Sequence, residues 1–270
     1  RSTFDEVEKK AQVATLQRTE YAQPAIGVFS AGLYGILQQA GFKADFAAGH
    51  SFGELTALWA AGVLSEADYL FLVKARGQAM AAPKDPDHDA GSMLAVKEDI
   101  SKIEPLLKQF PKVSIANFNS PTQIVLAGPK LEIQKVQDAC EKLGYSAILL
   151  PVSAAFHTPL IAFAQKSFAI ATKSVTFQSP QIPVFSNVTG KHYPQNAAAI
   201  QKNLESHLAS SVLFKQEIEN IYGAGGYCFV EFGPKRVLSN LVKDTLGDRP
   251  HLTISLNPSA SKNSDRSLRE

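Results

Sequence analysis

The chain has 270 residues, of which 45% are hydrophobic and 19% are charged, and its formal net charge is +2. This length allows one large domain, or a main domain with a smaller insert, and either buries a substantial core. A net charge so close to zero gives no reason to expect a nucleic-acid partner. The opening residues are polar and charged, and no apolar stretch is long enough to cross a membrane, so we expect neither a signal peptide nor a membrane partner.

The chain contains two cysteines, Cys140 and Cys228, and both lie in segments with apolar periodicity. We therefore predict two buried free thiols rather than a disulfide, which fits a reducing, cytoplasmic setting. No group of cysteines and histidines has the spacing of metal ligands, so the sequence predicts no metal site.

The N-terminal part of the chain is dominated by helical patterns. Its first twenty residues are charged and indicate a helix without a clear start. A second helix is predicted over residues 22–40, and Gly41 suits its C-terminal cap. An apolar stripe runs along this helix at Ile26, Phe29, Leu33 and Leu37. A short strand at 45–48 then leads into a helix over 52–62, and Ser65 caps a helix that reaches residue 81.

From residue 90 to residue 151 the pattern changes to short alternating strands and helices. We predict, in order, a strand, a helix, two strands, a helix and a strand, at 92–96, 100–110, 113–117, 124–127, 131–143 and 146–150. This β-α-β-β-α-β order is that of the ferredoxin-like unit. The polar loop at 83–89 indicates a domain junction before this segment.

The rest of the chain returns to mixed α/β order. Helices are predicted at 160–172, 197–209, 214–222 and 235–245, and strands at 182–186, 228–231 and 252–255. We therefore predict an α/β main domain from residues 1–89 and 152–258, with an inserted ferredoxin-like subdomain at 90–151. The polar, serine-rich stretch at 259–270 is typical of a linker-like tail.

The motif Gly49-His50-Ser51-Phe52-Gly53 lies between the predicted strand at 45–48 and the predicted helix at 52–62. This context is typical of a nucleophile elbow, in which a strained turn lifts a serine hydroxyl clear of the backbone. The flanking glycines leave room for the turn and for a substrate carbonyl. The motif therefore predicts Ser51 as a catalytic nucleophile, and the structural alternative is a tight turn in a buried βα unit.

A serine hydroxyl needs a base to take its proton, and six histidines are available. His50 is a poor candidate because neighbouring side chains at a strand end point in opposite directions. His157 follows the last subdomain strand, in a loop where two domains would meet over a cleft. We therefore predict a Ser51–His157 pair. The other histidines are predicted to be surface or structural residues: His88, His192, His207 and His251.

Arg76 lies on an otherwise apolar face of the helix that begins after Ser65. The other members of this face are Tyr69, Leu72, Val73 and Met80. A buried guanidinium without a partner is very costly, so Arg76 must find an anion. That anion is either an internal carboxylate, such as Glu54 or Glu231, or the carboxylate of a substrate held by two hydrogen bonds. The helical pattern alone does not decide between them.

At these positions the sequence resembles the malonyl-CoA:acyl carrier protein transacylase family, which includes the acyltransferase domains of polyketide and polyunsaturated fatty acid synthases. The resemblance spans residues 19–257. Five motifs carry it in order: Gly49-His50-Ser51-Phe52-Gly53-Glu54, Arg76-Gly77-Gln78-Ala79-Met80, Asn117-Phe118-Asn119-Ser120-Pro121 with Gln123, Ala155-Phe156-His157, and Glu231-Phe232-Gly233-Pro234. It implies an α/β-hydrolase-like domain with a ferredoxin-like insert.

The resemblance also implies a reaction. Ser51 is similar to the serine that becomes malonylated, His157 to its general base and later acid, and Arg76 to the anchor of the malonyl carboxylate. The donor would be malonyl-CoA and the acceptor the phosphopantetheine thiol of an acyl carrier protein, with no tightly bound cofactor. Neighbouring domains of a multidomain synthase are the other implied partners.

Four further residues receive roles from the same resemblance. The backbone N–H of Phe52 would donate to the oxyanion, and Asn117 would be a polar residue of the cleft. The backbone carbonyl of Ser210 would orient His157 in place of an aspartate. Phe156 would occupy the space that a 2-methyl group needs, which favours malonyl over methylmalonyl by about 1–3 kcal/mol.

One departure from the family pattern concerns the oxyanion hole. Family members carry an apolar strand and a Gly-Gln-Gly segment, whose glutamine N–H donates the second hydrogen bond; no such segment precedes Gln23 here. Loss of one donor typically lowers the rate about 100- to 1,000-fold, so this chain is expected to be weakly active. A carrier-protein docking module with little catalysis is therefore one alternative.

A serine hydrolase or thioesterase is the other alternative. Hydrolases of this architecture usually place an aspartate or glutamate between the serine and a histidine near the chain end. Here more than a hundred residues follow His157, and an arginine in the acyl pocket would serve no neutral lipid. The order of the residues favours transfer over hydrolysis.

Overall fold

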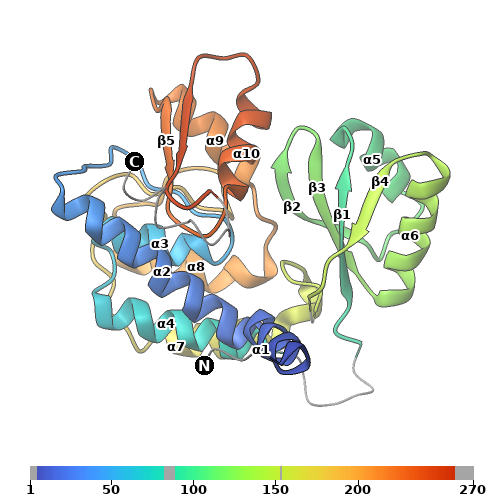
Figure 1. Ribbon diagram of the computed structural model, residues 1–270, viewed down its shortest axis with the longest axis horizontal. Coiled ribbons are helices and arrows are strands. Elements are labelled where there is room, and N and C mark those ends of the chain that lie inside the picture. The colour runs from blue at the N-terminus through green and yellow to red at the C-terminus, as the bar shows by residue number, and fades with distance from the viewer. Residues whose placement is uncertain (1–4, 82–88, 153, 259–270) are drawn as a thin grey trace.

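The described residues of this computed structural model are 5–81, 89–152 and 154–258, and they form two parts that lie side by side (Figure 1). The smaller part holds β1 (Ser92–Lys97), α5 (Ile100–Leu107), β2 (Ser114–Ser120), β3 (Gln123–Gly128), α6 (Lys130–Lys142) and β4 (Ser146–Leu149). This is the element order predicted for residues 90–151. The protein is a mixed α/β structure, as the sequence predicts.

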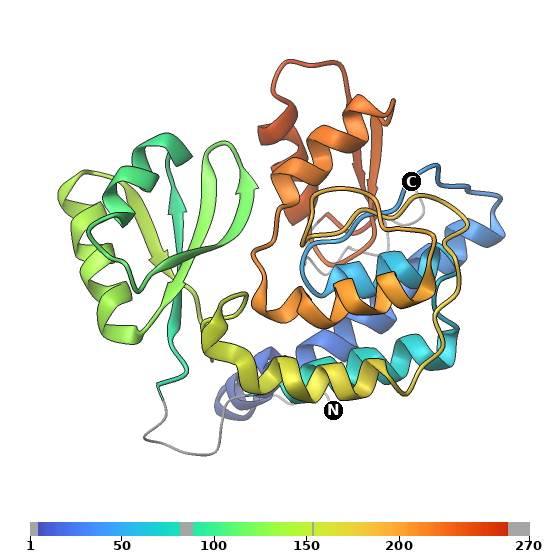
Figure 2. The ribbon, with the colours of Figure 1, turned by 180° about the vertical axis from the view of Figure 1, so that it is seen from behind.

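The larger part begins with α1 (Glu6–Gln17), α2 (Thr19–Gln39), α3 (Gly53–Ala60) and α4 (Glu66–Ala79). After the smaller part come η1 (Pro159–Ile161), α7 (Ala162–Thr172), α8 (Ala197–Ser206) and η2 (His207–Ala209). The last described elements are α9 (Phe214–Gly223), β5 (Cys228–Glu231), α10 (Val237–Leu246) and β6 (Leu252–Ser255). Seen from behind, α4 and α7 run side by side (Figure 2).

The sheet of the smaller part has four antiparallel strands in the order β2-β3-β1-β4. Alternate side chains of its central strands point to opposite faces, as the period of two in a strand requires. On one face, Leu94 and Leu126 pack against Ile103 of α5 and Ile133 of α6. On the other face, Met93 belongs to the core of the larger part. Both faces of the sheet are therefore covered.

The helix α2 packs on α4 through small and polar residues. Of the predicted stripe only Leu33 is fully buried, and Ile26 is 39% exposed. The buried residues of α2 are instead Gln23, Gly27, Ser30, Leu33 and Tyr34. Glycine brings the helices together, because a Cβ on Gly77 of α4 would lie 3.0 Å from the carbonyl oxygen of Thr19. The stripe prediction was wrong for this reason: close contact selected small side chains over large apolar ones.

Capping residues mark the ends of α2 and α4. Gly41 follows α2 with a φ of 91°, a conformation that favours glycine, and this confirms its predicted place at the C-terminal end. The Ser65 hydroxyl accepts a hydrogen bond from the Asp68 N–H at 3.1 Å, so the predicted start of α4 is also confirmed. The face of α4 that contains Arg76 is buried, as its spacing predicts.

The segment before Ser51 is extended but forms only one bridge. Ala47 pairs in parallel with Val184, through the Ala47 N–H to the Pro183 carbonyl and the Phe185 N–H to the Ala47 carbonyl, both at 2.9 Å. The strands predicted at 45–48 and 182–186 are therefore isolated bridges rather than full strands, and Phe185 forms a second one with His192. The pairing of Ala47 with Val184 still places the end of residues 182–186 beside the turn that contains Ser51.

The strands β5 and β6 pair in parallel and form a separate two-stranded sheet. Cys140 is a buried free thiol in α6, as predicted, but Cys228 is exposed at the start of β5. The prediction of burial was wrong for Cys228 because no described strand or helix covers the start of this sheet, where Tyr227 and Leu252 are also exposed.

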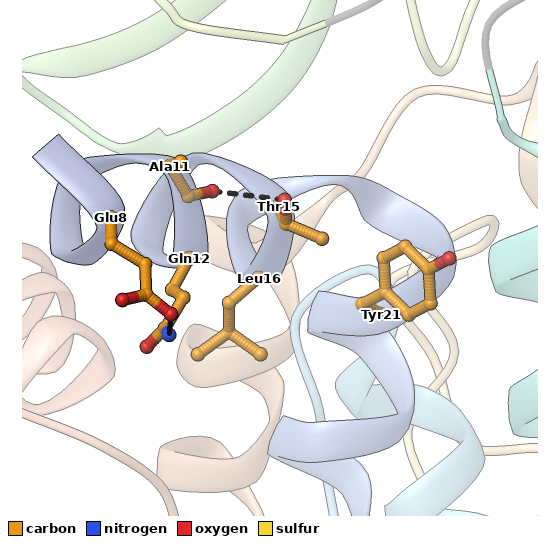
Figure 3. Close-up of a pocket in the computed structure, with 6 residues that line it drawn as sticks. All are labelled: Glu8, Ala11, Gln12, Thr15, Leu16 and Tyr21. Atoms are coloured by element: carbon orange, nitrogen blue, oxygen red, sulfur yellow. Dashed lines mark hydrogen bonds between the residues drawn. The ribbon is translucent and has the colours of Figure 1, made fainter. Parts of the chain in front are cut away.

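The helix α1 lies on the outside of the larger part and buries none of its own residues. A hollow of about 420 Å³ runs along it, lined by Glu8, Ala11, Gln12, Thr15, Leu16 and Tyr21 (Figure 3). None of the helices in the described part of the chain is long and apolar enough to span a bilayer. The predicted linker-like tail at 259–270, and all of the predicted junction loop except Asp89, lie outside the described residues.

Candidate active site

A sharp turn lifts Ser51 out of the backbone between an extended segment and α3. Ser51 has a φ of 49°, in the left-handed region, which costs an L-residue about 1–2 kcal/mol. A Cβ on Gly49 would lie 2.1 Å from the backbone carbon of Gly53, so only glycine allows the two arms of the turn to approach. The backbone therefore has the predicted form of an elbow.

The side chains of Ser51 and His157 meet, although 106 residues separate them. Ser51 Oγ lies 2.7 Å from His157 Nε2. On the other side of the ring, Nδ1 lies 3.0 Å from the Ser210 carbonyl oxygen and 3.2 Å from that of His207. Because carbonyls only accept, Nδ1 carries the hydrogen and Nε2 is left to accept the serine proton. Ser210 is therefore in the predicted place, joined there by His207.

The His157 ring is a neutral base at ordinary pH. It is only 4% exposed, and this burial lowers its pKa to about 3. The charges of the Arg76 guanidinium and His50 contribute to this lowering of the pKa, and the two carbonyl hydrogen bonds oppose it. A neutral imidazole with a free Nε2 lone pair is the form that can take a proton from serine.

Backbone pairing between the two parts fixes the carbonyls behind His157. The Phe118 N–H of β2 donates to the Val212 carbonyl at 2.8 Å, and the Val212 N–H donates to the Ala116 carbonyl at 2.8 Å. The His157 N–H donates to the Leu208 carbonyl at 3.0 Å. The smaller part thus holds residues 208–212 against the loop that carries the histidine.

Arg76 reaches Ser51 from the buried face of α4. The guanidinium is 1% exposed; Nη2 donates to Ser51 Oγ at 3.1 Å and Nη1 donates to Gln23 Oε1 at 2.8 Å. Neither predicted internal carboxylate pairs with it, since Glu231 accepts hydrogen bonds at the start of α10 and Glu54 acts only through its charge. No carboxylate in the described ranges forms an ion pair with Arg76.

The other predicted site residues lie around this centre. Phe52 follows Ser51 in the turn, and its N–H has no acceptor among the described residues. Phe156 is buried beside His157, and Asn117 is buried on β2. The His50 ring turns to Asn119 instead of the Ser51 hydroxyl, with Nε2 2.7 Å from Oδ1, so the prediction that it is no base for Ser51 agrees with its position.

Asn187 forms hydrogen bonds to both arms of the elbow, which we call its bracket. The sequence analysis did not predict this residue as part of the site. Its Oδ1 accepts the Ser51 N–H at 2.5 Å, while its Nδ2 donates to the Gly49 carbonyl at 2.6 Å and to Glu217 Oε1 at 2.9 Å. Its own N–H donates to Glu54 Oε2 at 2.9 Å. The side chain of Asn187 therefore ties both arms of the turn to Glu217, and its backbone N–H ties the same residue to Glu54.

The buried acids below the elbow form a network of their own. Tyr193 donates its hydroxyl to Glu54 Oε1, and His207 Nε2 lies 3.3 Å from Glu54 Oε2. Burial raises the pKa of Glu54 to about 7, although the Tyr193 and Asn187 hydrogen bonds lower it. Burial, and then the charge of Glu54, raise the pKa of Glu217 well above its ordinary value.

The remaining histidines are structural or lie at the surface, as predicted, where they are described. His207 is buried in η2, and burial lowers its pKa well below the ordinary value. His192 and His251 contact backbone carbonyls near them in sequence, at 3.2 and 2.7 Å. His88 lies outside the described residues. Within the described ranges no three His, Cys, Asp or Glu side chains are arranged to hold a metal ion.

A sequence signal for Asn187 did exist. The residue directly follows the strand predicted at 182–186, and the carboxyl ends of neighbouring parallel strands meet at one edge of a sheet. The strand predicted before Ser51 ends at that same edge. A polar residue in this position was therefore a candidate for contact with the elbow, whereas Gln23, on a helix far from the motif, had no such signal.

A serine in a nucleophile elbow, hydrogen-bonded to a buried neutral histidine, is typical of one class of protein. These are enzymes that transfer acyl groups through an ester on that serine. The profile of the family described as "Acyl transferase domain" matches residues 3–269, and the chain belongs to this family. The resemblance predicted from the motifs is thereby confirmed.

Two relatives and a solved structure place the chain within the family. One polyunsaturated fatty acid synthase polypeptide of Thraustochytrium sp. is 37% identical over 269 residues, which cover 98% of this chain and 9% of that protein. The malonyl CoA-acyl carrier protein transacylase of Synechocystis sp. is 34% identical over 237 residues, 87% of this chain and 78% of the transacylase. A type II polyketide synthase acyl carrier protein in complex with its malonyl-transacylase matches with a TM-score of 0.82 and 33% identity, over 94% of this chain and 82% of that chain.

Proposed function

We propose that this chain moves a malonyl group from malonyl-CoA to the phosphopantetheine thiol of an acyl carrier protein, through a malonyl ester on Ser51. One observation carries the proposal. Ser51 Oγ lies 2.7 Å from His157 Nε2 and 3.1 Å from Arg76 Nη2, so a nucleophile, a base and a cation for the malonyl carboxylate converge on one point.

In the first half of the reaction Ser51 attacks the thioester carbon of malonyl-CoA. His157 Nε2 takes the hydroxyl proton as the Oγ–C bond forms, and the Phe52 N–H donates to the oxyanion. When the intermediate collapses, the C–S bond breaks and His157 returns the proton to the CoA sulfur. The second half reverses these steps, with the phosphopantetheine thiol as the nucleophile and Ser51 as the leaving group.

The orientation of His157 supports transfer over the hydrolase alternative. Its Nδ1 donates to the carbonyls of Ser210 and His207, where a serine hydrolase usually places a carboxylate. Arg76 is buried and has no carboxylate partner among the described residues. Its guanidinium is therefore a cation that can bind the carboxylate of an acidic acyl group. The relative and the solved complex named for malonyl transfer and for a carrier protein support the same substrate and partner.

The domain organisation is part of this proposal. The antiparallel order β2-β3-β1-β4, with α5 and α6 on one face, supports a ferredoxin-like subdomain at 90–151 inserted in an α/β-hydrolase-like domain. The match to 9% of a fatty acid synthase polypeptide supports a role beside other synthase domains. The cytoplasmic setting stays a prediction.

The test is the intact mass of the protein after incubation with malonyl-CoA. Wild type should gain one malonyl group and pass it to an acyl carrier protein bearing phosphopantetheine. Ser51→Ala should gain none. Steady release of free malonate and CoA without a carrier protein would favour the hydrolase, and carrier binding without any adduct would favour the docking module.

Replacing Arg76 by alanine is expected to reverse the acyl preference. The variant loses the cation that holds the malonyl carboxylate, so malonyl loading should fall about 100-fold, while acetyl loading should hold or rise. The measurement is the ratio of malonyl to acetyl adducts by mass, with both thioesters in one mixture. If malonyl loading persists and acetyl loading does not rise, Arg76 is not the anchor.

A further inference from the structure

One buried carboxyl group below the elbow contacts three residues that are distant in sequence. Glu54 lies in the first turn of α3, just after Ser51, and its side chain is fully buried. Its Oε1 accepts the hydroxyl hydrogen of Tyr193, and its Oε2 accepts the Asn187 N–H at 2.9 Å. The same Oε2 lies 3.3 Å from His207 Nε2. Glu54 is thus connected to the two segments, around Asn187 and His207, that contact the catalytic pair.

The contact with Asn187 connects Glu54 to the nucleophile. Glu54 accepts the backbone N–H of Asn187, and the side chain of Asn187 forms the bracket of the elbow. In this bracket Oδ1 accepts the Ser51 N–H at 2.5 Å, and Nδ2 donates to the Gly49 carbonyl at 2.6 Å. A bracket can hold the turn only if its own backbone is fixed. Glu54 therefore sets the place from which Asn187 reaches Ser51.

The contact with His207 connects Glu54 to the base. Nε2 of His207 faces two acceptors, Glu54 Oε2 and, at 3.4 Å, Asn187 Oδ1, so Nε2 carries the ring hydrogen. The short helix η2 begins at His207, and two of its carbonyls hold His157. The His207 carbonyl accepts from Nδ1 at 3.2 Å, and the Leu208 carbonyl accepts the backbone N–H at 3.0 Å. Because the His207 side chain is fully buried, its contact with Glu54 fixes where these carbonyls lie.

We propose that Glu54 is a positioning residue for both members of the Ser51–His157 pair. Through Asn187 it holds the elbow, and through His207 it holds the carbonyls that orient the base. The inference rests on the proposed function and adds to it a residue and the two connections by which that residue acts. A carboxylate suits this position because its oxygens only accept hydrogen bonds and all of its partners donate them. Glu54 acts through these neighbours and exchanges no proton with the substrate.

Glu54→Met tests both connections because it keeps the length of the side chain and removes its acceptors. The geometry of the Ser51–His157 pair should loosen, so kcat for malonyl loading of the folded protein should fall about 100-fold. The KM for malonyl-CoA should change less than about threefold, since Arg76 keeps its contacts. Glu54 also acts on Arg76 through its charge. Loss of that charge would change malonyl and acetyl loading unequally, whereas loss of position lowers both alike, so an unequal loss would overturn the inference.

Two smaller changes separate the position of Glu54 from its charge. Glu54→Gln removes the charge but keeps one oxygen for Asn187 and His207, and its amino group can donate to Tyr193, so kcat should stay within about threefold of the wild type. Glu54→Asp keeps the charge and both oxygens but retracts them by one methylene, so kcat should fall about 30-fold with an unchanged KM. A glutamine variant slower than the aspartate variant would contradict the inference. If Glu54→Met does not fold, Glu54→Asp still decides.

His207→Leu breaks the connection to the base alone. Its kcat should fall about tenfold, which is less than the loss in Glu54→Met. The double variant should be no slower than Glu54→Met, because both changes break the same contact. Losses that multiply in the double variant would contradict a connection through His207.

Glu231→Met is the matched control, because the Glu231 carboxyl group also accepts hydrogen bonds from three donors. These are the Leu238 N–H at 3.0 Å, the Ser239 N–H at 2.8 Å and the Ser239 hydroxyl at 2.6 Å, all at the start of α10 and not at the elbow. The control should lower the free energy of unfolding and leave the kcat of the folded protein unchanged. A loss of kcat equal to that of Glu54→Met would overturn the inference.

A second measurement does not require acyl transfer. A fluorophosphonate reacts with a serine that a histidine activates, so its rate of reaction with Ser51 should fall about 100-fold in Glu54→Met and about 30-fold in Glu54→Asp. A wild type that reacts with this probe but gains no malonyl group would contradict the proposed function, and the labelling rates would still decide the inference. Equal labelling of the wild type and Glu54→Asp would overturn the inference and leave the proposed function intact.

Discussion

His157→Gln is expected to lower the rate of Ser51 malonylation about 100- to 10,000-fold, because the glutamine cannot take the hydroxyl proton that Nε2 accepts at 2.7 Å. Malonyl-CoA binding should change little, since Arg76 and not His157 meets the carboxylate in the proposed site. Quenched mass measurements over a series of malonyl-CoA concentrations separate the rate of malonylation from the binding of malonyl-CoA. The decrease should appear in kcat. A variant that loads malonate at the wild-type rate would remove His157 from the mechanism.

The pH profile of the wild type tests the same residue. Burial lowers the pKa of His157 to about 3, so the neutral form that accepts a proton is present well below the ordinary value of 6.5. The loading rate should therefore show no fall centred at 6.5. The same pKa makes the free energy of unfolding depend on pH. As the pH falls from 6.5 toward 3, His157 binds a proton in the unfolded chain but not in the folded protein, so the folded protein becomes less stable. A rate that halves near 6.5 would contradict the buried, neutral ring.

Asn187→Ala is expected to disable the site and destabilise the fold together. The change leaves the Ser51 N–H, the Gly49 carbonyl and Glu217 Oε1 without their partner, and each unpaired buried group costs about 1–3 kcal/mol. The elbow also loses the bracket that holds Ser51 in the left-handed region. Denaturant unfolding should show a loss of about 3 kcal/mol or more, and the folded fraction should load malonate about 100-fold more slowly.

Asn203→Ala provides the comparison for Asn187. Asn203 is a half-buried asparagine of α8 whose Nδ2 donates to Ser186 Oγ at 3.0 Å, one residue from Asn187 but away from the elbow. Its loss should cost about 1 kcal/mol and leave the loading rate of the folded protein unchanged. If both variants load at the wild-type rate, the elbow does not depend on its bracket.

The parts of the fold that depend on local chemistry could be predicted from the sequence. Ser65 and Gly41 mark helix ends because capping involves only neighbouring residues, and the alternation of the smaller sheet follows from a period of two. The elbow motif and the apolar face around Arg76 are likewise short-range patterns. Ser51 and Arg76 were predicted from them and His157 from its place after the last strand of the smaller part, and the structure brings all three together.

What the sequence did not predict depends on contacts between distant segments. Asn187 contacts Ser51 across 136 residues and donates in turn to Glu217, and only its place at the end of the strand predicted at 182–186 pointed to the first of these contacts. The prediction of the apolar stripe on α2 was wrong because Gly77 lets the two helices approach until large apolar side chains no longer fit between them. The predicted burial of Cys228 was wrong because apolar periodicity predicts a strand but does not predict which element covers that strand.

Three non-glycine residues in the described ranges have a positive φ, and two of them are Ser51 and His157, at 49° and 61°. Each such residue costs about 1–3 kcal/mol, which glycine would not incur. At both positions, therefore, the amino acid with the lowest backbone strain is glycine, which has no reactive side chain. Selection of this domain for heat resistance alone would favour replacement of the two side chains on which the proposed chemistry depends, so directed evolution of a more stable variant has to screen for turnover at every round.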